Sequence, residues 1–443
     1  VRCAMFTRDQ LIKLLAPLIV EQILTVLVGM ADVVMVAAVG ETAVSGVSLV
    51  DSISILIIQI MGAMATGGAV VCSQYLGKRQ VRDAGTAAGQ LVFVTLAISM
   101  AVTVAALAGN RHLLAVIFGQ VEQEVMDNAQ TYFWITALSY PFIGLYNARA
   151  ALFRSMGNSK VSMFTALVMN GINITGNAIC VFGLKMGVAG VAYPTLISRM
   201  TAAVLILILL QNRHNALRIR KIRALRPHPR MIRTILSIGI PGGLESGMFQ
   251  FGKIFLQSLV SSLGTASIAS YAVACSLVTL LYLPGNALGL GLITIVGQCV
   301  GAGKPKEAMH YTRLLLGINY LILAVISTAM FFGTDWLVSV YNLSSEAAAI
   351  SHVLLRAHCA AMILWPAAFT LPNALRAAMD ARFTMMVSVF SMWAFRIGFA
   401  YVFVNLFKLG VPGVWYGMFI DWAFRAAVFL ARFSGFERRA VSV

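Results

Sequence analysis

The sequence predicts an all-α integral membrane protein in which twelve transmembrane helices form two homologous six-helix lobes. Hydrophobic residues make up 59% of the 443 residues and charged residues only 11%, whereas a soluble domain has about 25% charged residues. The apolar residues form runs long enough to cross a bilayer, which takes about 20 residues. The second half of the chain also repeats the first half.

The apolar runs predict the positions of the twelve helices. A period of two, typical of a membrane β-barrel, is absent from the sequence, so the runs favour helices. The first run is longer than the apolar core of a signal peptide, and we expect it to be retained. The predicted spans are 11–39, 43–76, 86–108, 125–152, 160–182, 187–211, 232–262, 267–300, 312–334, 348–375, 384–406 and 411–433.

The distribution of basic residues predicts the orientation. The formal net charge is +17, but most basic residues lie near the chain ends or in loops after even-numbered spans, a pattern that does not indicate nucleic-acid binding. Loops after odd-numbered spans hold only Arg111, Lys185 and Lys408. The positive-inside rule therefore places both termini and the basic loop 212–231 on the cytoplasmic side of a plasma (cell inner) membrane. We interpret this loop as a topology determinant, with contact to anionic lipid as the alternative.

Motifs for enzymatic chemistry are absent from the sequence. It contains no phosphate-binding loop, metalloprotease motif or nucleophile elbow, so we expect neither an enzyme nor a cofactor. The cysteines are scattered without close pairs, which favours small apolar residues over a metal site or a disulfide framework. They are Cys3, Cys72, Cys180, Cys275, Cys299 and Cys359.

An internal duplication predicts the domain organisation. A shift of 224 positions brings identical residues together, among them Pro17 with Pro241, Glu21 with Glu245, Gly40 with Gly264 and Gln74 with Gln298. Duplicated halves are characteristic of transporters, whose substrate site lies between the repeats. The predicted parts are an N-terminal lobe (1–211), a basic cytoplasmic linker (212–231), a C-terminal lobe (232–433) and a cytoplasmic tail (434–443).

The segments MADVVMVAAVG in the first span, GNSK after the fourth, and NITGNAICVFGLKMGVAGVAY across the fifth and sixth resemble the multidrug and toxic compound extrusion (MATE) family. The resemblance covers nearly the whole chain. It implies two six-helix lobes around a central cleft, and export of organic, often cationic, compounds in exchange for H⁺ or Na⁺. Small organic molecules and membrane lipid are the partners that we expect, and we expect a monomer.

The resemblance also implies a cation-coupling site in the N-terminal lobe. Asp32 matches an acid on the first helix of the family, and Asn173 matches a polar residue on the fifth. Asn177 takes the position of a second acid, and an amide cannot titrate. Na⁺ binding at Asp32 is one interpretation and protonation is the other, while hydrogen bonding between helices is the alternative for the two Asn residues.

Further ionisable groups inside the spans are candidates for binding substrate or cation, because such groups are costly in a bilayer and face the protein interior. Glu21 lies one helical turn after Pro17, about 16 Å along the helix from Asp32, and Glu245 is its counterpart in the repeat. Asp51 lies early in the second span. For all three, a structural hydrogen-bonded role is the alternative.

The C-terminal lobe does not repeat the acids of the N-terminal lobe. Arg396 takes the place of Asn173, and Lys253 adds a second cation to this lobe. Both need carboxylate partners that the sequence does not identify. Asp421 and Arg425 are four residues apart on the last span and are predicted to form a structural ion pair.

Together these features predict a secondary antiporter. A carboxylate such as Asp32 in a low-dielectric interior favours taking up a proton or cation, and its neutralisation permits the first helix to repack. The alternative is a flippase of lipid-linked precursors or polysaccharides with a similar two-lobe fold, which the two cations of the C-terminal lobe keep open.

Overall fold

The fold is built from helices joined by short loops, and the described part of the chain contains no strand. The computed structural model describes residues 5–119, 122–212, 215–217 and 227–436. Most of the predicted linker and the last seven residues of the predicted tail therefore lie outside the described residues.

Six predicted spans in the first half correspond to α1 (Arg8–Ala37), α2 (Glu41–Gly77), α3 (Val81–Phe118), α4 with α5 (Gln123–Leu138 and Tyr140–Ser155), α6 with the π-helix η1 (Ser159–Ala178 and Ile179–Gly183) and α7 (Ala189–Leu210). The fourth span is interrupted at Ser139. Pro141 follows two residues later and has no N–H to donate to a helical hydrogen bond, which accounts for the interruption.

The second half repeats this order with α8 (Pro229–Ser261), α9 (Thr265–Gly301), α10 (Pro305–Ser339), α11 to α12 (Ser345–Ala361, η3 Met362–Leu364, η4 Pro366–Thr370 and Leu371–Ala377), α13 to α14 (Ala381–Ser391, η5 Met392–Ile397 and Gly398–Asn405) and α15 (Val411–Ser434). Ten of the predicted spans form helices long and apolar enough to cross a membrane. The other two are the interrupted α4–α5 and α8. The twelve-helix, all-α fold is confirmed.

The backbone of the loops repeats together with the helices. Gly40 and Gly264, which precede α2 and α9, have φ angles of +146° and +103°, values that favour glycine because it has no Cβ. Lys185 and Lys408 both adopt the left-handed region, with φ angles of 52° and 55°. The duplication seen in the sequence therefore extends to the conformation of equivalent turns.

The chain divides into two compact units within α8. The N-unit comprises Phe6–Gly243, and the C-unit comprises the chain from Leu244 onward together with Met5. In the N-unit the first half of α8 packs closely on α2, since a Cβ on Gly67 would lie 2.7 Å from the carbonyl oxygen of Ile235. This packing explains why the division falls after the predicted linker.

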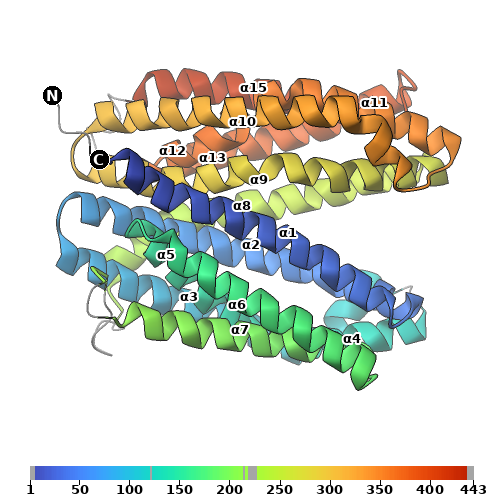
Figure 1. Ribbon diagram of the computed structural model, residues 1–443, viewed down its shortest axis with the longest axis horizontal. Helices are drawn as coiled ribbons and strands as arrows, with labels where there is room; N and C mark the ends of the chain where they lie inside the picture. Colours follow the sequence, from blue (N-terminus) through green and yellow to red (C-terminus); the bar gives the residue numbers. More distant parts are fainter. Residues whose placement is uncertain (1–4, 120–121, 213–214, 218–226, 437–443) are drawn as a thin grey trace. The chain divides into compact units, whose positions relative to one another are not determined.

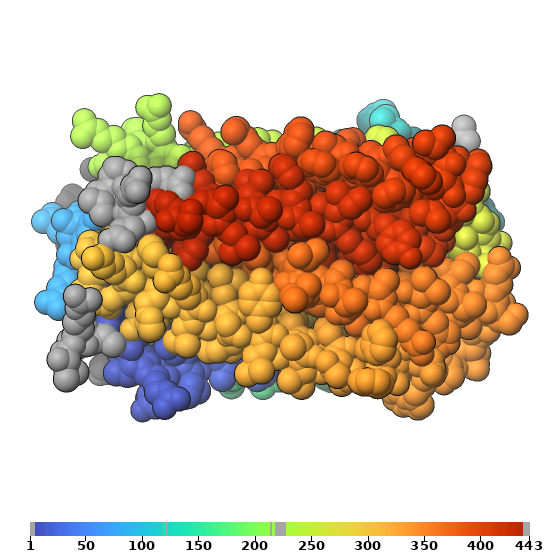
Figure 2. Space-filling model, turned by 90° about the horizontal axis from the view of Figure 1, so that it is seen from above, coloured from blue at the N-terminus to red at the C-terminus, as the bar shows by residue number. Residues whose placement is uncertain are grey.

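Each unit has its own apolar core. In the N-unit α6 packs against α1 and α7, while α2 packs against α3, α4 and α5, and Figure 1 shows these helices side by side. In the C-unit α11 packs against α9, α10 and α15. Figure 2 shows α15 in red and the α10–α11 segment in orange on one face of this unit. Large apolar side chains such as Val34 and Phe332 are exposed, as expected for helices that lie in a membrane.

Candidate functional site

The N-unit brings Asp32, Asn173 and Asn177 together. The side-chain amide of Asn177 donates to Asp32 Oδ1 at 2.8 Å and to Asn173 Oδ1 at 3.4 Å. Asn173 in turn donates to the hydroxyl of Thr195 on α7 at 3.0 Å. Four side chains from three helices thus form one hydrogen-bonded chain, which we call the N-unit network.

Asn177 leaves one acceptor in the N-unit network unused. Its side chain is fully buried, and its Oδ1 atom has no hydrogen-bond partner among the described residues. A buried acceptor without a partner is costly, and it lies on the residue that bonds Asp32. The network therefore combines a half-buried carboxylate with an open oxygen, which suits a proton or a small hard cation.

Asp51, the other candidate aspartate of the N-unit, lies on α2. Tyr132 on α4 donates to Asp51 Oδ1 at 3.3 Å. Arg199 on α7 lies within electrostatic range of both Asp32 and Asp51, but no direct ion pair with either is formed in the described part of the chain. Its Nη1 atom instead donates to Ser139 Oγ at 2.7 Å. The arginine thus offsets part of the negative charge without occupying the carboxylates.

Sequence reasoning missed Thr195, Tyr132 and Arg199. A signal existed for Arg199, since a single arginine within an apolar span faces the interior by default. Thr195 and Tyr132 gave no such signal, because neutral hydroxyl groups are common in transmembrane helices.

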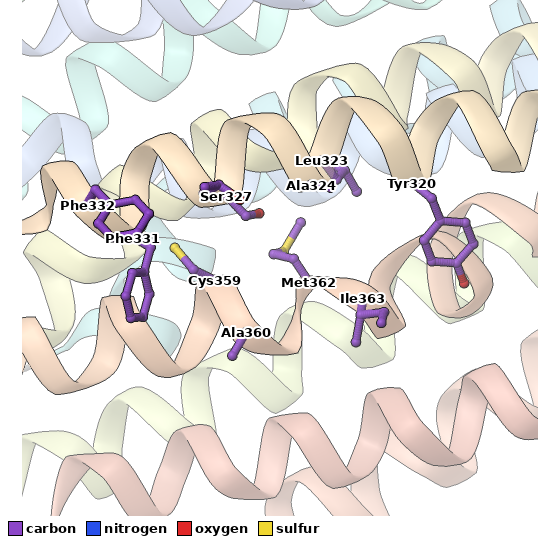
Figure 3. A pocket seen from close by; sticks show the side chains of 11 residues that line it. Tyr320, Leu323, Ala324, Ser327, Phe331, Phe332, Cys359, Ala360, Met362 and Ile363 are labelled. Atoms are coloured by element: carbon purple, nitrogen blue, oxygen red, sulfur yellow. The ribbon is translucent and has the colours of Figure 1, made fainter.

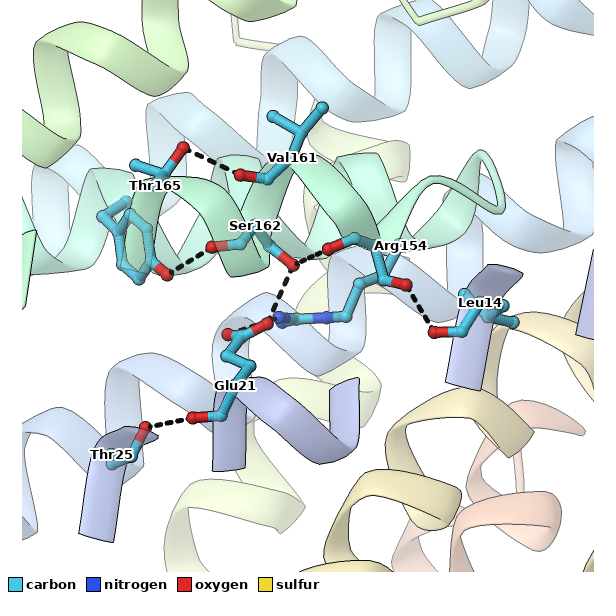
Figure 4. Close-up of polar contacts among 9 residues, drawn as sticks. Leu14, Glu21, Thr25, Arg154, Val161, Ser162 and Thr165 are labelled. Atoms are coloured by element: carbon cyan, nitrogen blue, oxygen red, sulfur yellow. Dashed lines mark hydrogen bonds and ion pairs between the residues drawn. The ribbon is translucent and has the colours of Figure 1, made fainter. Parts of the chain in front are cut away.

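Glu21 is separate from the N-unit network. It accepts a hydrogen bond from Ser162 at 2.9 Å and lies 3.7 Å from Arg154 Nη1, as Figure 4 shows. Thr25 donates to its backbone carbonyl at 2.9 Å. Glu21 is buried, and its contacts join α1 to α5 and α6. These partners favour the structural alternative.

Glu245 repeats this arrangement in the C-unit. Arg376 Nη2 lies 2.8 Å and 2.7 Å from its two carboxylate oxygens, and Nη1 of the same arginine donates to Asn373 at 3.0 Å. Arg154 and Arg376 are equivalent in the sequence repeat. Both glutamates are therefore partly or fully neutralised by equivalent arginines, and a direct role for Glu245 in binding a cation stays a prediction.

Lys253 and Arg396 approach one aromatic ring. Lys253 Nζ and the Arg396 guanidinium carbon each lie 5.2 Å from the ring centroid of Phe249, a distance typical of cation–π interactions. Arg396 Nη1 lies 3.9 Å from Asp421, whereas Lys253 has no carboxylate partner in the described ranges. The sequence did not identify Asp421 as the partner of Arg396, because the two residues lie on different spans.

Asp421 already has a closer partner. Arg425 Nε lies 2.7 Å from Asp421 Oδ1, and Ser391 donates to the same carboxylate oxygen. Arg425 also donates to the carbonyl of Ser388 at 2.9 Å. The predicted ion pair between Asp421 and Arg425 is confirmed.

A cavity of about 560 Å³ lies elsewhere in the C-unit, between α10 and α11–η3 (Figure 3). Its lining includes Tyr320, Phe331, Met362 and Ile363 and carries no carboxylate or basic group. Ile363 is 70% exposed. The cavity contains none of the predicted site residues, and its largely apolar lining favours lipid contact.

The fold and the two buried polar regions define a polytopic membrane transporter. A family model described as MatE matches residues 17–179 and 241–402, one match in each half. The chain belongs to this family, the MATE transporters.

Curated relatives extend over nearly the whole chain. An uncharacterised transporter, YisQ of Bacillus subtilis, is 27% identical and aligns with 93% of this chain and 90% of its own length. A probable multidrug resistance protein, NorM of Thermotoga maritima, is 25% identical over 98% and 94%. The multidrug export protein MepA of Staphylococcus aureus is 22% identical over 84% and 82%.

Solved structures share the fold. A crystal structure of MATE in the bent conformation has a TM-score of 0.90 and 20% identity, covering 98% of this chain and 97% of that one. An outward-facing multidrug resistance MATE family transporter has a TM-score of 0.91 and 20% identity, covering 97% and 96%. At this identity the likeness establishes the twelve-helix, two-lobe fold.

Proposed function

We propose that this protein is a secondary antiporter that exports organic compounds from the cell in exchange for H⁺ or Na⁺. The observation that carries the proposal is the N-unit network, where Asn177 bonds Asp32 and presents an unpartnered buried oxygen. The names of two relatives refer to multidrug export or resistance, which supports organic compounds as substrates.

The network suits a cation because it combines the carboxylate of Asp32 with the unpartnered, buried amide oxygen of Asn177. A proton would bind Asp32 itself, whereas Na⁺ would take oxygen ligands from Asp32 and from the amide of Asn177. Arg199 supplies one positive charge near the two carboxylates of Asp32 and Asp51, which leaves one negative charge for an arriving cation to neutralise. We assign the binding of that cation to Asp32.

Occupancy of Asp32 is linked to α1 as a whole. Pro17 lies inside this helix, where it removes a backbone hydrogen bond and favours a bend. α1 packs against α6, and the bond from Asn177 to Asp32 is one of the contacts that join them. Breaking or weakening this bond on cation binding allows α1 to repack. The coupling between cation and substrate is then reciprocal.

A flippase of lipid-linked precursors or polysaccharides is the second candidate. Lys253 and Arg396 favour it, because the phosphates of such precursors are anionic. The N-unit network favours the antiporter, since a flippase without ion coupling needs no such site.

The orientation belongs to the same proposal. We propose a plasma-membrane protein whose termini are cytoplasmic, as the asymmetry of basic residues indicates. Lys78→Cys and Ser345→Cys place single thiols at exposed positions after an even and an odd span. In a background without native cysteines, an impermeant thiol reagent applied to intact cells should label the thiol at 345 and leave that at 78 unlabelled. The reverse pattern contradicts the orientation.

Dye efflux from liposomes tests the antiport. Purified protein is reconstituted with rhodamine 6G or fluorescein inside, one dye cationic and the other anionic, and a pH or Na⁺ gradient is imposed. Dye should leave faster with one of the two gradients than without any, and the effective gradient identifies the ion. Dye flux that is independent of both gradients contradicts the proposal.

A further inference from the structure

The C-unit holds two cations whose charge is not compensated within the unit. Its span residues include two carboxylates, Glu245 and Asp421, and each has a closer arginine partner, Arg376 and Arg425 respectively. Lys253 has no ion pair or hydrogen bond in the part of the chain that the structure describes. A charge in a low-dielectric interior is costly unless it is paired.

Lys253 does not point toward the nearer end of its helix. It stands eight residues before Ser261, where α8 ends, which corresponds to about 12 Å along the helix. Its ammonium group lies 5.2 Å from the ring of Phe249, one turn toward the start of the helix. This direction is opposite to that expected if the lysine reached the nearer membrane surface. Its side chain is nevertheless exposed, so a ligand has access to it.

Arg396 contributes a second donor next to the first. The guanidinium lies at 5.2 Å from the same ring, and its side chain is only 11% exposed. The distance of 3.9 Å to Asp421 is long for an ion pair. Its Nε atom is buried without a hydrogen-bond partner among the described residues, as is Nε1 of Trp393 on the same turn of η5. Both of these unused nitrogen atoms are donors, and the unused acceptor beside them is Oδ2 of Asp421, at 3.9 Å from Arg396 Nη1.

We propose that Lys253 and Arg396 form a binding site for the anionic group of the transported compound. The ligand class is an organic anion whose carboxylate, sulfonate or phosphate pairs with the two cations, while its apolar or aromatic part packs on Phe249 and neighbouring aromatic side chains. This inference depends on the proposed function only in that the bound compound is taken to be the transported one. It extends the family resemblance, which implies substrates that are often cationic.

The duplication strengthens the inference. The position equivalent to Arg396 in the first half is Asn173, and that equivalent to Lys253 is Gly29. The cations are thus present in one unit only, although the scaffold around them is shared. If the two cations served only to stabilise the shared scaffold, both units would be expected to have them.

Equilibrium binding tests the site without any gradient. The protein is placed in nanodiscs of phosphatidylcholine, and fluorescence anisotropy is recorded with fluorescein and with rhodamine 6G, which share a xanthene ring system but differ in charge. Empty nanodiscs give the baseline for partition into lipid. We expect tighter binding of fluorescein than of rhodamine 6G by the wild type.

The variants separate charge from structure. Lys253→Met should raise the Kd for fluorescein about tenfold or more, since it removes one of the two cations that pair with the anionic group. Lys253→Arg, which keeps the charge, should retain most of the affinity. Lys408→Met, which removes an exposed lysine from a loop of the same unit, is the matched control and should bind as the wild type does. Equal fluorescein affinity in Lys253→Met and the wild type overturns the inference.

The same chemistry would bind the phosphate of a lipid headgroup, so a second arm uses nanodiscs that contain phosphatidylglycerol. Unchanged fluorescein affinity there supports an organic anion. Displacement of fluorescein by the anionic lipid assigns the site to lipid and overturns the inference. Because binding is measured without transport, a wild type that binds fluorescein but shows no gradient-driven efflux refutes the proposed function while leaving this site in place.

Discussion

The polar regions of the two units around Asp32 and around Phe249 carry opposite charge on the same scaffold. The N-unit has two acids, Asp32 and Asp51, near one arginine, Arg199. The C-unit has three cations near the ring of Phe249, namely Lys253, Arg396 and Arg425. One acid, Asp421, lies beside the two arginines. Equivalent turns nevertheless have nearly equal φ angles, such as those at Lys185 and Lys408. The duplicated halves therefore share their backbone but differ in their charged residues. This difference suits two different ligands.

A second comparison shows what has not diverged. Glu21 with Arg154 and Glu245 with Arg376 are equivalent ion pairs in the two units. The first pair joins α1 to α5, and the second joins α8 to α12. Groups found in both units therefore belong to the shared scaffold, and groups found in one unit are the candidates for function.

The largest expected effect on transport follows from removing Asp32, an acid that only the N-unit has. Asp32→Asn preserves the shape of the side chain and its bond with Asn177 but deletes the charge. We expect normal insertion and loss of gradient-driven efflux by about tenfold or more, equivalent to ~1.4 kcal/mol or more. Efflux from liposomes is the measurement. Asp335→Asn, at an aspartate whose side chain is 72% exposed, is the matched control and should transport normally.

The largest expected effect on stability concerns the buried ion pair between Asp421 and Arg425 in the C-unit. Asp421→Asn leaves Arg425 without its carboxylate and should lower the free energy of unfolding by about 3–5 kcal/mol, the cost of breaking a buried pair. Thermal unfolding in detergent measures it as a lower Tm. The double variant Asp421→Asn with Arg425→Met should recover part of the loss. A Tm equal to that of the wild type for the single variant would mean that the pair is not buried.

The two equivalent glutamates should differ in strength. Glu245 contacts Arg376 through both oxygens at 2.7 Å and 2.8 Å, whereas Glu21 lies 3.7 Å from Arg154. Glu245→Gln should therefore cost about 1.5–3 kcal/mol of stability, the usual contribution of hydrogen bonds to charged groups, and Glu21→Gln less. The same unfolding experiment compares them. A larger loss of stability for Glu21→Gln than for Glu245→Gln would show that the distance between glutamate and arginine does not determine how much each pair contributes.

The smallest effect is expected from Arg199. Arg199→Met removes a positive charge that competes electrostatically with an arriving cation at Asp32. The concentration of H⁺ or Na⁺ that gives half-maximal efflux should fall several-fold, because the site then attracts the cation more strongly. A dose series of the coupling ion in the liposome assay measures this. An increase in that concentration would indicate that Arg199 organises the network and does not compete for its charge.

Most of the fold was predictable because hydropathy and duplication are properties of the chain itself. The interruption at Ser139 was also signalled, by Pro141. The partners of buried charges were not, since Arg154 and Arg376 lie at the ends of their helices and resemble residues that only set the orientation. The structure shows that they reach Glu21 and Glu245, more than 130 positions away in the sequence. Such contacts depend on how helices pack, which residue spacing along one helix does not determine.

We propose that the two units have different ligands, with a cation bound in the N-unit and an organic anion in the C-unit. The most direct test measures fluorescein binding and gradient-driven efflux for Asp32→Asn and Lys253→Met side by side. Asp32→Asn should bind fluorescein like the wild type and lose its response to the gradient. Lys253→Met should bind fluorescein at least about tenfold more weakly, while its remaining efflux still responds to the gradient. If both variants lose both properties to the same extent, the two units do not act separately and the account is contradicted.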